Sequence, residues 1–273
     1  MLQPLRTVGL LALLSLSLAA CKSEFEKVRT SGDPEQILKL ADSYYAEGKY
    51  GKSQALYELV VNALRGDPRL QDAYFRYADS YFQTKQYVLA SYYFRNYAET
   101  YTVSEKRREA QYMEAMSYVA LSPDFRLDQE YTRKAITALE QYVNTYPDTD
   151  KLERINDQLD ELRAKQEAKA YDAARLYFDM KQYQSAVQAY ERVLQDYPDS
   201  DRAQEIRFRI ADSYIRLADN SVIAKRRERY ESAVDAINVY LKKYPRGEFA
   251  RSLRSDLNRI NALLKDNDQY VRY

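Results

Sequence analysis

The chain has 273 residues, of which 30% are charged, 45% hydrophobic and 13% aromatic. It contains no His and a single Cys, which excludes His-based catalytic triads, His-ligated metals, internal disulfides and thiolate-cluster metal sites. Only 6 Gly and 7 Pro are present, too few for a sandwich or barrel rich in tight turns, and the aromatic content excludes disorder as the main state. The composition therefore disfavours many classes of enzyme.

The first twenty residues have the composition of a secretory signal. Arg6 is their only charged residue, and residues 8–18 are mostly Leu, Ala and Ser. Eleven helical residues rise about 16 Å, roughly half of a hydrocarbon core, so this segment is too short to span a membrane. Residues 18–21 read Leu-Ala-Ala-Cys and resemble the bacterial lipobox, in which the Cys is acylated and becomes the first mature residue. We expect residues 1–20 to be a signal peptide and Cys21 to be lipidated; an ordinary signal peptide is the alternative.

The mature chain starting at Cys21 would carry no net charge. It holds 41 Lys and Arg against 41 Asp and Glu, because Arg6 is the only charged residue removed. This gives no general attraction to nucleic acid or to an anionic membrane, so we expect no nucleic-acid partner. The lipid bilayer would be reached through acylated Cys21, since each buried CH₂ contributes about 0.8 kcal/mol. Residues 21–32 are predicted to be a lipidated tether. Lys22 stands where enterobacterial lipoproteins retained in the inner membrane carry Asp, and this resemblance favours the outer membrane.

A short phrase of small and aromatic residues recurs along the chain. Residues 40–45, 77–82 and 210–215 read Leu-Ala-Asp-Ser-Tyr-Tyr, Tyr-Ala-Asp-Ser-Tyr-Phe and Ile-Ala-Asp-Ser-Tyr-Ile, and looser copies occur at 114–118 and 173–177. A second phrase follows, with apolar residues spaced by 4 and 3 and a Pro five positions later. It occurs three times, as Ala135, Leu139, Tyr142 and Pro147, as Ala186, Tyr190, Val193 and Pro198, and as Ala233, Ile237, Tyr240 and Pro245. This spacing forms one stripe of a helix that Pro then stops.

Together the two phrases resemble the tetratricopeptide repeat, a pair of helices that approach closely through small residues. No single pair buries its apolar face, so pairs stack into a superhelix. We predict an all-α fold, a tetratricopeptide-repeat superhelix of five helix pairs plus a C-terminal capping helix, with the solenoid over residues 33–265 and a tail over 266–273. The predicted pairs span 33–65, 69–101, 104–146, 150–197 and 201–244, and the last helix spans about 247–265.

Local signals predict where several helices begin and how long one of them is. An apolar stripe from Leu152 to Tyr177 predicts a single helix of about thirty residues, over 150–180. Residues 122–127 and a longer stretch in the fifth repeat are predicted insertions. Four Asp residues are predicted at helix starts, two before Pro and two in capping-box-like sequences: Asp33, Asp67, Asp150 and Asp201.

Aromatic residues on the first helix of each pair supply a candidate peptide groove. The Tyr near the end of each phrase is assigned to the core, and the next residue turns about 100° away, toward the concave groove or its edge. An apolar groove of this kind suits extended or helical peptide segments. Packing against a neighbouring helix is the alternative for each side chain. The core assignments are Tyr44, Tyr81, Tyr118, Tyr177 and Tyr214, and the client-groove candidates are Tyr45, Phe75, Phe82 and Tyr112.

Two basic clusters occur, at 106–108 and at 225–229. A solvated surface is the simpler interpretation of both, and a partner-facing patch is the alternative. Arg226, Arg227 and Arg229 are the partner-docking candidates. The sequence lacks a Gly-rich phosphate loop and calcium-loop spacing, so we expect no catalytic residues, no metal and no cofactor.

A signal peptide, a lipobox and five tetratricopeptide pairs in about 250 mature residues resemble the BamD family of outer-membrane protein assembly factors. The insertion at 122–128 and the turns at 144–150 and 196–200 are the more specific parts of this resemblance. It implies a non-enzymatic lipoprotein of the β-barrel assembly machinery, on the periplasmic side of the outer membrane. It also implies that the C-terminal repeats dock the periplasmic domains of BamA, that the N-terminal repeats bind unfolded outer-membrane proteins, and that other lipoproteins of the machinery are partners.

Two other kinds of tetratricopeptide lipoprotein remain as alternatives. SusD-type nutrient-uptake lipoproteins are much longer and often use Trp, which this chain lacks. A factor that coordinates peptidoglycan and envelope growth is the second alternative. Co-purification from solubilised membranes would separate the three, because each predicts a different partner: a barrel protein with periplasmic domains, a transporter or a cell-wall synthase.

Overall fold

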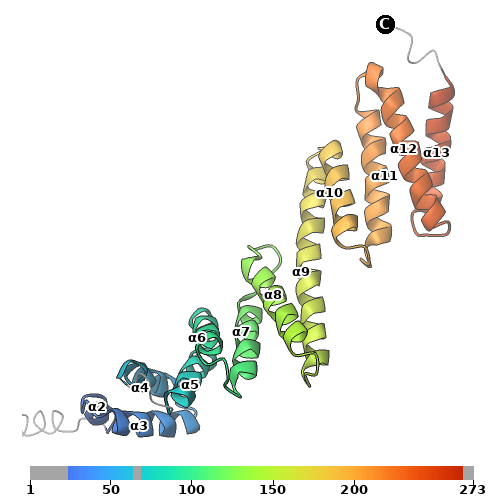
Figure 1. Cartoon of the computed structure of the whole chain (residues 1–273). Helices are drawn as coiled ribbons and strands as arrows, with labels where there is room; N and C mark the ends of the chain where they lie inside the picture. Colours follow the sequence, from blue (N-terminus) through green and yellow to red (C-terminus); the bar gives the residue numbers. More distant parts are fainter. Residues whose placement is uncertain (1–23, 64–68, 267–273) are drawn as a thin grey trace, which may run out of the picture. The chain divides into compact units, whose positions relative to one another are not determined.

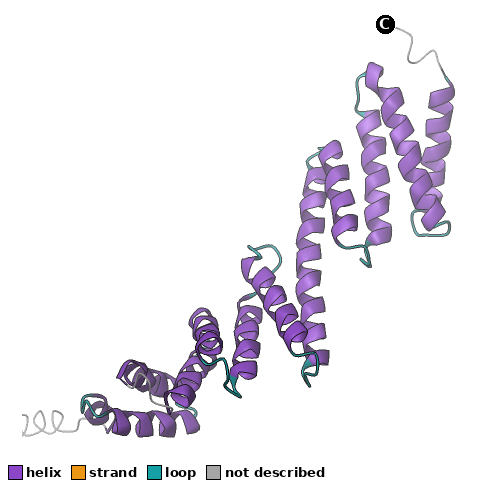
Figure 2. Cartoon of the chain, in the orientation of Figure 1, coloured by secondary structure: helices purple, strands orange, loops and turns teal. Residues whose placement is uncertain are grey.

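The computed structural model describes residues 24–63 and 69–266, which form twelve helices (Figure 1) and contain no strand (Figure 2). After the short helix α2 (Glu24–Arg29), ten helices follow in pairs and α13 (Ala250–Lys265) ends the series. The all-α tetratricopeptide prediction is confirmed, and each predicted pair matches an observed one. The pairs are α3 (Pro34–Ala46) with α4 (Tyr50–Ala63), α5 (Arg69–Gln83) with α6 (Tyr87–Thr100), α7 (Arg107–Leu121) with α8 (Glu130–Thr145), α9 (Leu152–Asp179) with α10 (Tyr183–Asp196), and α11 (Ala203–Asp219) with α12 (Ile223–Lys243).

The chain divides into two compact units. Unit 1 comprises residues up to 123 together with 128–162, and unit 2 comprises 124–127 together with residues from 163 onward. The helix α9 is continuous over 28 residues and contributes to both, which confirms the predicted long helix. The predicted signal peptide, Cys21 and Asp67 lie outside the described residues, as does most of the predicted tail.

Buried alanines mark the contact between the two helices of a pair. The small residue of each recurring phrase is fully buried, as is its Ala counterpart on four of the second helices. In the first pair Ser53 takes that place, and its hydroxyl donates to the carbonyl oxygen of Ala41 at 3.0 Å. Small side chains let the helix backbones approach closely, and these positions therefore fix how the pairs align. The alanines are Ala41, Ala78, Ala115, Ala174 and Ala211 on the first helices and Ala90, Ala135, Ala186 and Ala233 on the second.

The turn inside three of the pairs uses one left-handed residue. Gly48, Lys85 and Lys181 have φ values of 71°, 60° and 60°, and each follows by three residues an aromatic residue near the end of the first helix, Tyr45, Phe82 and Phe178. In each turn the amide of the left-handed residue and the amide after it donate to carbonyls of the first helix, for example Gly48 to Tyr45 at 3.0 Å. This geometry closes a helix end, and only Gly adopts it without strain.

The turn between pairs is closed by a hydroxyl that follows the second helix by a fixed spacing. Tyr97 bonds Ser104 at 2.7 Å, and Tyr142 bonds Thr149 at 3.4 Å. The same hydroxyls accept the amide two residues later, so Thr149 accepts from Lys151 at 3.2 Å. Ser200 does the same for Arg202 at 3.0 Å. These hydroxyls, and not the predicted Asp150 and Asp201, bind the first free amides of α9 and α11.

The predicted cap at Asp33 is confirmed, because its carboxylate accepts from the amides of Glu35 and Gln36 at the start of α3. Residues 24–29 were predicted to belong to a polar tether. They form α2 instead, and Phe25 and Val28 pack against the core of the first two pairs. An apolar residue at every third position gives this short helix one face to bury.

Candidate functional site

The predicted client-groove residues Tyr45 and Phe82 lie at the turns inside the first two pairs. Each is half-buried and packs edge-on against an aromatic residue at the start of the second helix, Tyr50 at 5.5 Å and Tyr87 at 5.2 Å between ring centroids. The Tyr45 hydroxyl also donates to the carboxylate of Asp79 in the next pair at 2.5 Å. Both side chains therefore hold the repeats together and keep only part of their surface accessible.

Phe75 and Tyr112 lie deeper than the groove prediction requires. Phe75 is half-buried between Phe94 and Tyr97, with ring centroids at 5.5 and 5.4 Å. Tyr112 is only 4% exposed and belongs to the core of the third pair, where it lies against Tyr142 at 5.6 Å. The assignment of Tyr112 to the groove is wrong, because the helices that follow it in the stack cover its ring.

The core assignments hold for some of the recurring tyrosines and fail for one. Tyr81 and Tyr118 are buried, and Tyr44 and Tyr214 are half-buried. Tyr177 is 41% exposed, so its assignment to the core is wrong. The ring of Tyr81 is covered by Tyr93 of its own pair, stacked at 5.0 Å. In the fourth pair the residue that corresponds to Tyr93 is the small Ala189, so no such ring is available to cover Tyr177.

The predicted partner-docking arginines lie on the first turns of α12 and not in a loop. Arg226 Nε donates to the carbonyl oxygen of Ser221 at 2.9 Å, and Arg229 bonds the hydroxyl of the same residue. Arg227 is exposed and pairs with Glu231 at 3.3 Å. Two of the three arginines thus fasten the turn before α12, and Arg227 presents its guanidinium to solvent.

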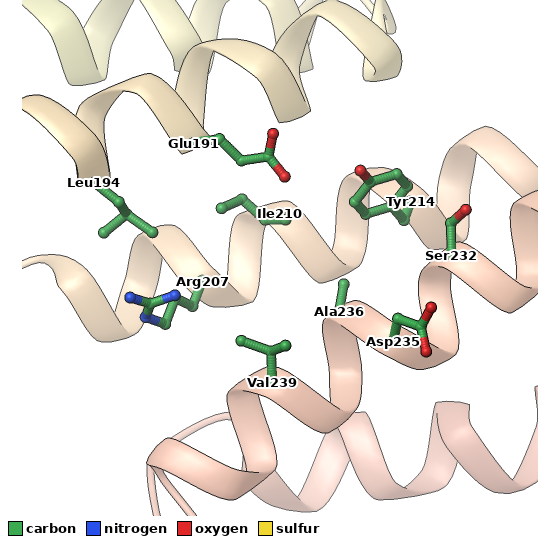
Figure 3. A pocket seen from close by; sticks show the side chains of 9 residues that line it. All are labelled: Glu191, Leu194, Arg207, Ile210, Tyr214, Ser232, Asp235, Ala236 and Val239. Carbon is green, nitrogen blue, oxygen red and sulfur yellow. The ribbon is translucent and has the colours of Figure 1, made fainter.

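Sequence reasoning missed a hollow in unit 2 where α11 forms the floor between α10 and α12. It has a volume of about 430 Å³. Figure 3 shows the Glu191 carboxylate reaching from α10 toward Ile210 and Tyr214 of α11, with Ala236 and Val239 of α12 opposite. A second hollow of about 460 Å³ continues it toward the start of α12 and shares three of its residues. The shared residues are Glu191, Tyr214 and Ser232; Lys225 and Arg229 of the basic cluster line the second hollow.

Two solvent-exposed carboxylates and one half-buried guanidinium line this hollow. Partial burial raises the pKa of the Glu191 carboxyl, and no ion pair within the described residues reaches Glu191 or Asp235. On the floor, the Nε atom of Arg207 is buried and has no hydrogen-bond partner among the residues that the structure describes. An apolar floor beside unpaired charges can bind a segment that supplies both an apolar side chain and polar groups of its own.

A family model described as "YfiO: Outer membrane lipoprotein" matches residues 30–230, nearly three quarters of the chain. The chain belongs to the YfiO family of outer membrane lipoproteins. The match includes the helix pairs up to the first turns of α12, so the half-buried aromatic residues of unit 1 and the α10 and α11 walls of the hollow lie within the family region, whereas the α12 residues of the hollow lie beyond residue 230.

Two relatives carry names from outer-membrane protein assembly. The outer membrane protein assembly factor BamD of Rickettsia prowazekii is 23% identical over 226 residues, which are 78% of this chain and 84% of that protein. A protein of Aquifex aeolicus, named as a candidate BamD, is 29% identical over 128 residues, which are 46% of this chain and 41% of that protein. Membership of the YfiO family supports a general role in outer-membrane protein assembly for this chain.

Solved tetratricopeptide structures also match. A thermophilic tetratricopeptide protein of Thermus thermophilus has a TM-score of 0.31 and 17% identity, with 84% of this chain and 100% of that chain covered. The TPR2AB domain of yeast Sti1 has a TM-score of 0.40 and 14% identity, with 87% and 96% covered.

No helix between residues 24 and 266, outside the gap at 64–68, has the length and apolar character needed to cross a membrane. Within the same residues no group of three or more acidic or Cys side chains is placed to hold a metal ion.

Proposed function

We propose that this YfiO-family chain is a non-enzymatic scaffold of the β-barrel assembly machinery that holds BamA through unit 2 and receives unfolded outer-membrane proteins on unit 1. The open hollow between α10 and α12 is the observation that carries the proposal, because a stack of helix pairs needs no such space for its own stability. Folded partners bind where apolar surface and unpaired charge are exposed together.

Docking of BamA on unit 2 is supported by the position of the basic cluster. Lys225 and Arg229 line the part of the hollow nearest the start of α12, and exposed Arg227 lies on the same helical turns. Charged residues at the rim of an interface steer association and fix its register, whereas the apolar floor supplies most of the binding energy.

Client binding on unit 1 is supported by the accessible parts of Tyr45 and Phe82. These side chains lie in adjacent pairs, linked by the bond from Tyr45 to Asp79. A wall made of helices has no free strand edge, so it would recognise alternate side chains of an extended segment and not its backbone. Phe82→Ala is expected to weaken binding of a C-terminal barrel-strand peptide by about 1–2 kcal/mol if Phe82 is an anchor. An unchanged dissociation constant, with helical content intact, would place the clients elsewhere.

Attachment to the outer membrane is proposed to occur through lipid on Cys21, with the repeats facing the periplasm. Cys21→Ser should leave the chain without lipid and release it into the soluble fraction. Mass spectrometry of the wild-type N-terminus is the direct measurement. Unmodified wild-type protein that still sediments with membranes would contradict this part of the proposal.

The experiment that tests the whole proposal is co-purification from solubilised membranes with a tag at the C-terminus. BamA and other lipoproteins of the assembly machinery are expected among the retained proteins. A transporter would favour the SusD-type alternative, and a cell-wall synthase would favour the factor that coordinates peptidoglycan growth. The Cys21→Ser variant, extracted without detergent, controls for proteins retained through shared membrane fragments.

A further inference from the structure

The two units contain corresponding grooves, and the correspondence can be counted along the chain. The buried alanines Ala78 and Ala211 align α5 with α11, and Ala90 and Ala233 align α6 with α12. In this alignment, four residues of unit 1 correspond to residues that line the hollow of unit 2. The corresponding pairs are Tyr74 with Arg207, Tyr77 with Ile210, Tyr81 with Tyr214, and Tyr93 with Ala236.

In unit 1 the groove is filled by one tyrosine of its own. The ring of Tyr93 lies 6.0 Å from that of Tyr74, 4.7 Å from that of Tyr77 and 5.0 Å from that of Tyr81. Tyr77 further bonds the Tyr81 hydroxyl at 2.9 Å. Three rings of α5 therefore form a seat for a fourth ring supplied by α6.

In unit 2 the residue at the position of Tyr93 is Ala236, which is too small to fill the groove. Of the three tyrosines that contact Tyr93 in unit 1, only one has a tyrosine counterpart in unit 2. Tyr214 remains, Ile210 supplies an apolar surface, and Arg207 replaces the outermost ring. The resulting hollow of about 430 Å³ can hold an aromatic side chain. Unit 1 thus shows which kind of side chain this helical frame accommodates.

The charged side chains that line the hollow indicate which charge a bound segment would carry. The Glu191 carboxylate points toward the hollow and Asp235 lines its other wall, and neither is paired within the described residues (Figure 3). A cation next to the incoming ring would compensate these carboxylates. The ring face of Tyr214 and the unpaired Arg207 Nε are further groups that a partner's backbone carbonyl or ring can contact.

We infer that the hollow between α10 and α12 binds an aromatic side chain with an adjacent Lys or Arg, presented by the periplasmic part of BamA. This inference rests on the proposed docking of BamA to unit 2 and specifies the chemistry of its anchor. The aromatic ring takes the place that Tyr93 has in unit 1, over Ile210 and against Tyr214, and the basic residue pairs with Glu191 and Asp235.

The test fills the hollow from within. Ala236→Tyr restores the residue of unit 1, and titration with the purified periplasmic domains of the organism's own BamA should show affinity at least about tenfold weaker than that of wild type. Ser255→Tyr, which adds the same ring to an exposed position of α13, is the matched control and should leave the affinity unchanged. Circular dichroism and the thermal midpoint verify that both variants keep the fold.

A second pair of variants tests the charge. Glu191→Gln combined with Asp235→Asn should weaken binding several-fold and reduce its dependence on salt, since screening acts on the lost ion pairs. Equal salt dependence in wild type and double variant would remove the cation from the inference. Because these substitutions preserve shape, they keep the test valid if Ala236→Tyr fails to fold.

The outcomes separate this inference from the proposed function. If wild-type protein fails to bind the BamA domains, the proposed function and the inference both fail. If wild type binds and Ala236→Tyr binds equally well, BamA docks elsewhere and only the inference is overturned. A photo-crosslinker at Val239 on the rim should react with BamA; a crosslink to residues 267–273 of the chain itself, or to a second copy, would assign the hollow to that occupant instead.

Discussion

In unit 1 the Tyr93 ring rests against three tyrosine rings of α5, whereas in unit 2 the corresponding residue is Ala236 and the corresponding space is a hollow. The helices around the two grooves have the same order, and their buried alanines occupy the same positions. A few side chains therefore decide whether the same frame becomes part of the core or a surface open to a partner. The difference shows that one repeat can fill its groove with a side chain of its own while another repeat of the same frame leaves the groove open.

The strongest expected effect concerns α9, which supplies residues to both units. Leu159 is buried in the core of unit 1, 6% exposed. Leu159→Pro should lower the free energy of unfolding by at least about 3 kcal/mol, since Pro removes a helical hydrogen bond and clashes with the preceding turn. Hydrogen exchange should show the loss in α7 and α8, with α11 and α12 as internal reference. Leu159→Ala, which keeps the helix, should lose about 2–3 kcal/mol; equal losses would show that the helix is already interrupted there.

Exchanging the residues that distinguish the two grooves tests the comparison directly. Tyr93→Ala should destabilise the protein by about 1–2 kcal/mol, because it removes a half-buried ring that packs against three others. The reverse exchange, Ala236→Tyr, should change stability by no more than about 0.5 kcal/mol, because it enters a space that is already open. Urea unfolding measures both. A large loss from Ala236→Tyr would mean that the hollow cannot hold a ring.

Two buried tyrosine hydroxyls, one in each unit, differ in whether they have a hydrogen-bond partner, and removing them should change stability by about 1 kcal/mol or less. Tyr97 of unit 1 bonds Ser104 at 2.7 Å, whereas the Tyr190 hydroxyl of unit 2 is buried and has no partner in the described part of the chain. Tyr97→Phe should cost about 1 kcal/mol, and Tyr190→Phe should be neutral or stabilise by up to about 1 kcal/mol, since it removes an unsatisfied polar group. A loss at Tyr190 equal to that at Tyr97 would indicate that its hydroxyl is bound, for example by water.

The smallest expected effect tests the left-handed turn shared by the two units. Gly48 has a φ of 71° with only one atom 4.0 Å from an added Cβ, so Gly48→Ala should cost about 1 kcal/mol through backbone strain alone. Gly51, at the start of α4, has open space and an ordinary φ, and Gly51→Ala should raise stability by up to about 0.5 kcal/mol. Thermal unfolding compares the two. Opposite signs are required, because only the first position needs a left-handed residue.

Much of the fold could be predicted because helix pairing depends on residues close together in sequence. The recurring Ala positions predicted every pair, and all of them are fully buried. The apolar stripe predicted the continuity of α9. Caps were less predictable: Thr149 and Ser200 satisfy amides that the neighbouring Asp residues were expected to bind, since the choice between adjacent side chains depends on where the preceding Tyr hydroxyl lies.

The candidate site was only partly predictable. Tyr45 and Phe82 were placed correctly on the first helices, but their packing against Tyr50 and Tyr87 uses part of the surface assigned to a client. Tyr112 was assigned to the groove but is buried, and Tyr177 was assigned to the core but is exposed. Burial depends on which neighbouring helix covers a residue as well as on the helix face that carries it. The hollow escaped notice, although Ala236 at the position of Tyr93 was a readable signal once the repeats were aligned.

The sequence by itself determined the helix pairs, their order, the long helix and the family resemblance, because small-residue spacing, apolar stripes and Pro positions act within one pair. Only the tertiary structure decided which aromatic rings fill a groove and where a groove stays open. That outcome depends on three helices at once, two from one pair and one from its neighbour, and the absence of a side chain at one position matters as much as the presence of others. Local patterns carry no information about a space left empty between repeats, and it is this space that distinguishes unit 2.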